Sequence, residues 1–281
     1  MTEAFRGRLN EAVFRETKDT MSANASLAST SAATSGEVSA EQTVEFQTSD
    51  GWRIVGTLHL PTAKAKIPGV VLVHGSRHES DAFGQVASPS LADTLSQQGL
   101  ATLRIDIRGR GASREPRRFY SMSPEQRDGV LLDVEAAIEF LAETTGIKSN
   151  RIGVVGEQDT AGASLIAAST RKNVASCVLI SGRLNRFAMD AFAETRKPIF
   201  CLVSKEDRRG LKDMVDVYLS SKNKHSRIKV FEGLALGTTM FSTWRHEYPS
   251  EIPIEDSIGE WLKETLGPKT REKKKTHKAA N

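Results

Sequence analysis

Six short apolar runs, each followed by a stretch with helical periodicity, limit the possible folds of this chain more than any other feature. Strands buried on both faces read as unbroken apolar runs, so the alternation predicts an α/β fold: a mostly parallel sheet with helices on both faces. The chain of 281 residues is long enough to bury such a core. The expected strands are 69–73, 101–105, 151–155, 175–180, 199–203 and 227–231, and the expected helices are 88–98, 124–143, 161–170, 183–195, 209–220 and 254–266.

An N-terminal antiparallel hairpin is expected ahead of this repeat. Residues 43–61 alternate apolar and polar side chains around Asp50-Gly51, a dipeptide that favours a tight hairpin turn. The α/β domain is therefore predicted to span residues 42–267. Residues 1–41 contain a run rich in Ser, Ala and Thr, which predicts a disordered extension, and residues 268–281 read as a disordered basic tail.

The positive charge of the chain is concentrated in that tail. Residues 269–281 hold six Lys or Arg against one Glu, a net charge of +5, and subtracting it from the total of +4 leaves −1 for the rest. A basic run without interleaved aromatic residues favours at most a weak, nonspecific electrostatic contact with nucleic acid or an anionic membrane.

The remaining composition excludes several classes of protein. No apolar run is long enough to span a membrane, and the first residues lack the apolar segment of a secretory signal. Cys177 and Cys201 lie inside apolar runs and are expected to be buried thiols, which fits a cytoplasmic location. We expect no cofactor and no metal, since the chain has neither a G-x-x-x-x-G-K loop nor a set of side chains with metal-ligand spacing.

Five motifs stand at the ends of expected strands. They are VVLVHGS, ending at Ser76; DIRGRGAS, 106–113; RIGVVG, 151–156; VSKED, ending at Asp207; and FEGLALG, 231–237. In this order and context the chain resembles the α/β-hydrolase fold over about residues 42–266, closest to the dienelactone-hydrolase-like and small-esterase members. Only residues 182–195 occupy the place where relatives often insert a lid, so we expect no lid domain.

The resemblance implies a catalytic triad, but only one of its three positions matches. Gln158 stands two residues after Gly156, where the family carries its nucleophilic serine, and an amide has no readily removable proton near neutral pH. Leu236 stands where the family carries its histidine. Asp207 occupies the position of the acid, although capping the helix that follows is the simpler role for it.

The resemblance also implies an oxyanion hole, the group of backbone N–H donors that stabilises a negatively charged intermediate. Its donors would be the N–H groups of Ser76 and Asp159. Arg77 and His78 follow Ser76 and are expected to line the pocket. The Asp159 carboxylate lies where a helix begins, so it can instead cap that helix.

These positions predict a protein without triad chemistry that uses the inherited crevice to bind a small molecule or a protein partner. The alternative is a hydrolase of ester bonds with unusual catalytic residues: Asp159 or Thr160 as the nucleophile, and His246, in a loop after the last strand, as the base. His78 is a second candidate base. A third hypothesis places the function in the basic tail.

Overall fold

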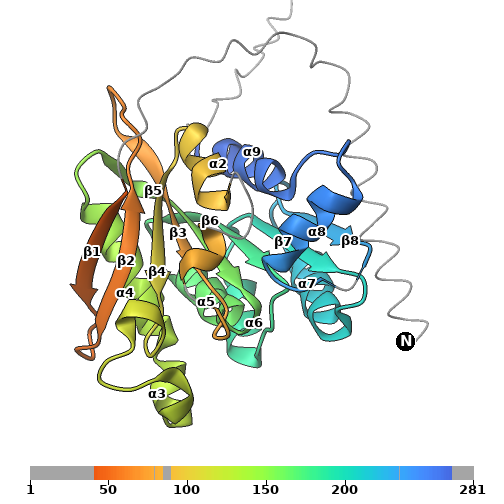
Figure 1. Cartoon of the computed structure of the whole chain (residues 1–281). Coiled ribbons are helices and arrows are strands. Elements are labelled where there is room, and N and C mark those ends of the chain that lie inside the picture. Colours follow the sequence, from red (N-terminus) through yellow and green to blue (C-terminus); the bar gives the residue numbers. More distant parts are fainter. Residues whose placement is uncertain (1–40, 79, 85–89, 234, 268–281) are drawn as a thin grey trace, which may run out of the picture.

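The computed structural model describes residues 41–78, 80–84, 90–233 and 235–267, and its centre is an eight-stranded sheet (Figure 1). The strand order is β1-β2-β4-β3-β5-β6-β7-β8. The pairs that include β1 or β2 are antiparallel, and all the others are parallel, as the sequence predicted. The bounds are β1 (Gln42–Gln47), β2 (Arg53–His59), β3 (Ile67–Val73), β4 (Ala101–Asp106), β5 (Ile147–Glu157), β6 (Val174–Ile180), β7 (Ile199–Ser204) and β8 (Arg227–Phe231).

The expected hairpin is formed by β1 and β2. Gly51 adopts a φ of +82°, a left-handed conformation that glycine reaches without steric cost, and it lets the chain reverse between the two strands. Strand β2 then pairs with β4, which attaches the hairpin to the edge of the parallel part of the sheet.

Helices cover both faces of the sheet, because alternate side chains of each strand point to opposite sides. In β3, Val71 and Val73 belong to the core beneath α4, α5 and α7, whereas Val70 and Leu72 belong to the core beneath α2 and α9. All four are completely buried. The helices are α2 (Leu91–Gln97), α3 (Pro124–Asp128), α4 (Val130–Glu143), α5 (Ala161–Thr170), α6 (Arg186–Ala193), α7 (Arg208–Ser220), α8 (Thr239–Glu247) and α9 (Ile254–Leu266).

The single helix expected over residues 124–143 is two helices, α3 and α4, which meet at Gly129. Ser123 caps α3 through a capping box, and Pro124 occupies the first turn. A Cβ atom at Gly129 would lie 1.9 Å from Nη1 of Arg108, so the guanidinium passes where a side chain would stand. Arg108 also donates to the carbonyl of Gln126, the acceptor that the next turn of a continuous helix would use.

Helix α8 corrects a second expectation, since residues 239–247 were predicted to lie in a loop. Met240 and Phe241 are buried, and Trp244 packs one turn further on against the same core. This apolar stripe is shorter than the stripes that identify the other helices, and it is interrupted by Ser242, Thr243 and Arg245. The segment is helical because tertiary packing on β8 and α9 compensates for a weak local pattern.

Two further expectations concern the edges of the domain. Helix α6 is the one helix between β6 and β7, so no lid domain is inserted there, as predicted. None of the helices in the described ranges combines the length and apolarity needed to cross a membrane. Residues 1–40 of the predicted extension (1–41) and the whole predicted basic tail (268–281) lie outside the described residues, so the contacts proposed for the tail stay a prediction.

Candidate active site

The turn between β5 and α5 has the backbone of a nucleophile elbow. β5 ends at Glu157, a short 3₁₀ turn covers Gln158–Thr160, and α5 begins at Ala161. Gln158 has a φ of +49°, in the left-handed region that non-glycine residues seldom adopt. This sharp, strained turn is the geometry that exposes a nucleophile in hydrolases, and here it is kept for a residue that cannot act as one.

The side chain of Gln158 lies between two glycines from different loops. A Cβ atom at Gly75, after β3, would lie 3.3 Å from Cβ of Gln158. A Cβ atom at Gly237, after β8, would lie 2.6 Å from its Nε2. Among the hydrogen bonds of the described residues, none joins this amide to an imidazole. The elbow side chain therefore fills the space between the two loops without contacting a base.

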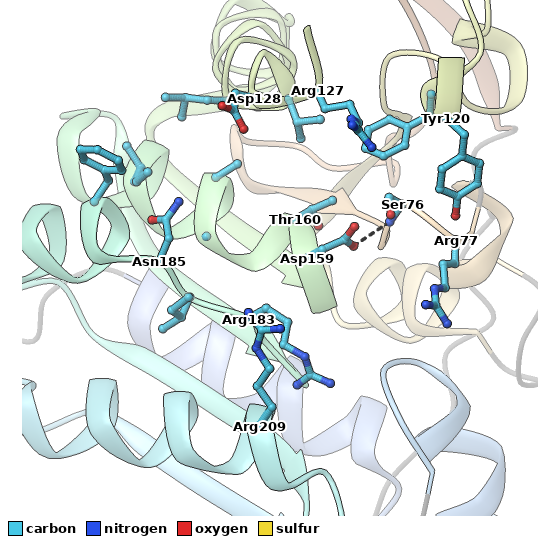
Figure 2. Close-up of a pocket in the computed structure, with 18 residues that line it drawn as sticks. Ser76, Arg77, Tyr120, Arg127, Asp128, Asp159, Thr160, Arg183, Asn185 and Arg209 are labelled. Atoms are coloured by element: carbon cyan, nitrogen blue, oxygen red, sulfur yellow. Dashed lines mark hydrogen bonds between the residues drawn. The ribbon is translucent and has the colours of Figure 1, made fainter. Parts of the chain in front are cut away.

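The Ser76 donor of the expected oxyanion hole is occupied. The backbone N–H of Ser76 donates to Oδ1 of Asp159 over 2.8 Å, and Figure 2 shows this bond at the centre of the site. Asp159 does not cap α5. The residue at the N-cap position is Thr160, and its side chain accepts no hydrogen bond from the backbone N–H groups of the helix. A carboxylate of the protein thus accepts the N–H that the resemblance assigns to a substrate oxygen.

A buried carboxylate next to the elbow, Glu157, is a site residue that sequence reasoning missed. It accepts hydrogen bonds from the N–H of Gly75 (2.9 Å) and from the N–H and hydroxyl of Thr238 (2.6 and 3.1 Å). It also lies 3.1 Å from Nδ1 of His78. Burial acts to raise the pKa of Glu157, but the hydrogen bonds from His78, Gly75 and Thr238 outweigh it and lower this pKa. Glu157 therefore stays ionised and joins the loops that follow β3, β5 and β8.

The only sequence signal for this role is an acidic residue at the end of an apolar strand, in IGVVGE. A charged side chain is rarely fully buried unless it is paired, so its place in a buried strand predicts a partner. The sequence does not say which partner, because Gly75 and Thr238 lie more than 80 positions away along the chain.

His78 is held by Glu157 and is partly exposed. The hydrogen bond that Nδ1 of His78 donates to the Glu157 carboxylate raises the pKa of His78, and burial opposes this only in part. A raised pKa increases the protonated fraction near neutral pH, and an imidazolium cannot accept a proton. His78 is therefore better suited to a charge-paired loop contact than to general-base catalysis at neutral pH.

At the two remaining triad positions, Asp207 has partners that stabilise the fold and Leu236 is a partly exposed aliphatic side chain. Asp207 caps α7 by accepting from the N–H of Gly210 (3.0 Å), and it pairs with Arg183 (2.8 Å). Leu236 is 38% exposed and has no group that can transfer a proton. The acid of the triad is thus present, but its described partners are a backbone amide and an arginine.

The two alternative catalytic residues from the sequence lie in different environments. Thr160 is buried, and its hydroxyl donates to the carbonyl of Glu157 (2.9 Å), which turns it away from solvent. His246 is exposed in the last turn of α8, a helix and not the expected loop. It is not among the described residues that line the cavity at the elbow.

A cavity of about 930 Å³ opens beside Ser76 and Asp159 (Figure 2). Arg77 lines it, whereas His78 turns to Glu157. Its charged lining residues are four arginines and two aspartates, and its apolar lining comes mainly from the starts of α4, α5 and α6. The charged residues are Arg77, Arg127, Arg183, Arg209, Asp128 and Asp159, and the larger apolar ones are Phe119, Val130, Leu131, Ile166, Leu184 and Phe187.

The thiols lie away from this cavity. Cys177 and Cys201 are free and buried in the sheet, as expected, and burial raises the pKa of the Cys177 thiol to about 12. Within the described ranges, no group of three or more His, Cys, Asp and Glu side chains has an arrangement that could hold a metal ion.

Comparison with known proteins assigns the fold. The model of the dienelactone hydrolase family matches residues 54–238. Among solved structures, the chain is similar to the esterase Pf2001 of Pyrococcus furiosus, with a TM-score of 0.63 and 18% identity over 81% of this chain and 92% of that one.

Two further structures have the same fold. A dienelactone hydrolase from Anabaena variabilis has a TM-score of 0.60 and 18% identity, over 81% of this chain and 98% of that one. The esterase domain of a Rhodothermus marinus protein has a TM-score of 0.61 and 15% identity, over 82% of this chain and the whole of that one. No curated protein matches the chain. These likenesses show an α/β-hydrolase fold of the dienelactone-hydrolase type, as the motifs predicted.

Proposed function

This chain belongs to the dienelactone hydrolase family, and from that premise we propose that it is a member that binds a small organic molecule without hydrolysing it. The observation that carries the proposal is the bond from the N–H of Ser76 to the Asp159 carboxylate. Loss of the triad alone would leave an oxyanion hole able to speed hydrolysis. Here one of its donors is taken by an anion of the protein itself.

Ester hydrolysis on this fold requires a nucleophile, a base to take its proton and donors for the oxyanion. Gln158 and Leu236 remove the first two. The third is weakened by Asp159, and loss of one oxyanion donor alone typically lowers kcat by about 10²–10³. Because the three deficits together remove the nucleophile, the base and one oxyanion donor, from two separate loops, they support a site that no longer performs this reaction.

The cavity supports a small molecule as the ligand. Its volume of about 930 Å³ lies within the range of about 300–1,000 Å³ that is usual for small-molecule sites. It combines charged groups with an apolar wall, a combination that fixes an organic molecule in one orientation.

We expect the purified chain to hydrolyse p-nitrophenyl acetate and butyrate no faster than protein-free buffer, and to resist labelling by a fluorophosphonate probe for serine hydrolases. Release of p-nitrophenol and protein mass spectrometry measure the two results. Asp159→Ala is the matched variant, because it frees the Ser76 donor but restores neither serine nor histidine: it should show no more than the small rate that an oxyanion hole alone supports, and it should also resist the probe. Turnover that disappears on substitution of Asp159, Thr160 or His246 would overturn the proposal.

A second candidate function, an ester hydrolase with an unusual base, is favoured by the contact between His78 and Glu157. A buried carboxylate that orients an imidazole is the usual arrangement of a general base, and the family and its solved neighbours are hydrolases. The attacking group would then be water, since the hydroxyl of Thr160 is bonded to the carbonyl of Glu157 and that of Thr238 to its carboxylate.

This second function makes its own prediction about pH. The base must be neutral, so the rate should rise as the pH passes upward through the raised pKa of His78. His78→Gln should abolish the activity, and His246→Gln should leave it unchanged. A pH profile of kcat/KM for the three proteins checks this, and a flat profile or an active His78→Gln variant excludes the candidate.

A further inference from the structure

Four arginines from four separate segments line the cavity beside the elbow. Arg77 comes from the turn after β3, Arg127 from α3, Arg183 from the loop after β6 and Arg209 from α7. Figure 2 shows Arg127 on one side of Asp159 and both Arg183 and Arg209 on the opposite side. Guanidinium groups bind carboxylates and phosphates through parallel N–H donors, so such a cluster favours an anionic ligand.

The acidic residues of the cavity do not balance this cluster. Asp128 and Asp159 face the four arginines, and Arg183 has Asp207 as a further partner. That leaves one arginine charge in excess even when Asp207 is counted. The body of the chain outside the basic tail carries a net charge of −1, so the positive cavity differs from the rest of the domain.

The Asp159 carboxylate shows that an anion can occupy this place. It lies among the arginines and accepts the N–H of Ser76, while the residue as a whole is exposed. A side chain held by one described backbone bond at an exposed position can rotate away at little cost. An external anion that takes the place of the Asp159 carboxylate gains the N–H of Ser76 as a donor. It also moves the competing negative charge of Asp159 away from the arginines.

An apolar wall lies beside the charged part of the cavity. It is formed by Val130 and Leu131 at the start of α4, Ile166 of α5 and Phe187 of α6. Phe187 is 76% exposed, so most of its ring is open to contact with a ligand. A ligand with an apolar body would cover this ring while its anionic group meets the arginines.

We propose that this cavity is a site for an organic anion, a carboxylate or phosphate group on an apolar body, and that Asp159 is an internal competitor which the ligand displaces from Ser76. This inference rests on the proposed function, because it names the ligand class of the same crevice. The two anionic groups share the chemistry that the guanidiniums recognise, and the choice of probes distinguishes them.

Isothermal titration calorimetry of the full chain with four probes tests the ligand class. The probes are 4-phenylbutyrate and phenyl phosphate, which combine an anion with a ring, 4-phenylbutanol, which keeps only the apolar body, and acetate, which keeps only the charge. We expect one or both of the first two to bind at least about tenfold more tightly than the alcohol and acetate. The tighter of the two identifies the anionic group. Binding of 4-phenylbutanol or acetate as tight as that of both anionic aromatic probes would overturn the proposal.

Two variants of α7 test the arginine cluster with matched charge. Arg209→Glu reverses a charge that lines the cavity, whereas Arg208→Glu reverses an exposed charge at the adjacent position, outside the lining. We expect Arg209→Glu to weaken binding of the preferred anion by about tenfold or more and Arg208→Glu to leave it within about twofold. Equal losses of affinity in the two variants would mean that binding depends only on the net charge of this surface. That result would contradict a specific anion site in the cavity.

Asp159→Asn tests the internal competitor. Asparagine keeps an oxygen acceptor and nearly the same shape but removes the negative charge, so we expect anion affinity to rise by about tenfold. Unchanged or lower affinity would exclude displacement of Asp159.

Failure of this inference can be told apart from failure of the proposed function. Ester turnover that is inhibited by the anionic probes would refute the non-hydrolytic function and keep the anion site. Absence of both turnover and probe binding would refute the anion site and keep the loss of hydrolysis.

Discussion

Replacing Asp133 with alanine is expected to lower the free energy of unfolding by about 3–5 kcal/mol, because it leaves a buried guanidinium without its main partner. Arg108 is 1% exposed, and Asp133 is completely buried. The Asp133 carboxylate accepts from the backbone N–H and from Nε of Arg108, both over 2.8 Å. Asp50 binds the far end of the guanidinium but reaches neither of these donors. Equilibrium unfolding in urea, with the midpoint and slope fitted together, measures the loss.

The control for this prediction is Asp190→Ala. Asp190 is an exposed helical aspartate paired with Arg186 four residues away, and its removal should change stability by no more than about 0.5 kcal/mol. A loss below about 1 kcal/mol for Asp133→Ala would show that Asp50 alone satisfies Arg108. That result would also contradict the explanation given for the helix break at Gly129, which requires a firmly held guanidinium.

Replacing Glu157 with alanine is expected to have the next largest effect, a loss of about 3 kcal/mol. It would strip the N–H groups of Gly75 and Thr238 of their acceptor in a buried place, and each such group costs about 1–3 kcal/mol. Glu232→Ala, which removes an exposed glutamate paired with Lys205, is the matched control and should be nearly neutral. A similar loss in both variants would refute the joining role of Glu157.

The pH dependence of this effect has a definite sign. Burial acts to raise the pKa of Glu157, but its hydrogen bonds lower this pKa below the ordinary value of 4.5. The stability that the Glu157 carboxylate contributes is therefore fully present above pH 4.5 and is lost as the pH falls through the lowered pKa. The hydrogen bond that His78 donates to Glu157 raises the pKa of His78, so the stability that His78 contributes is present below 6.5 and is lost as the pH rises through the raised pKa. The stability difference between the wild type and Glu157→Gln should therefore be largest between pH 4.5 and 6.5. A difference that does not vary with pH would exclude the ionic contact.

Much of the fold was predictable because its strands are apolar and its turns use characteristic residues. The six parallel strands, the hairpin at Asp50-Gly51 and the cap at Ser123 all follow from local patterns. The break at Gly129 was not predictable, because it depends on an arginine that comes from a loop 21 residues earlier in the chain. Helix α8 was missed because its apolar face is short and its stability comes from contacts with other elements.

The site was predictable in its residue types but not in its contacts. The motifs identified Gln158 and Leu236 as replacements, since position relative to a strand end is a local property. Whether the Asp159 carboxylate caps its own helix or turns to Ser76 depends on a loop 83 residues away. The same reason hides Glu157, whose partners come together only when the sheet is assembled.

The bond between Asp159 and Ser76 also bears on what it would take to build triad chemistry into this chain. A working triad would need Gln158→Ser, Leu236→His and the withdrawal of Asp159, three changes in two separate loops. Any one of these changes made by itself leaves at least one requirement of the triad mechanism unmet, whether the nucleophile, the proton acceptor or the full set of oxyanion donors. A single substitution is therefore not expected to give triad hydrolysis. We therefore expect laboratory evolution to produce triad hydrolysis on this chain only from libraries that vary all three positions together.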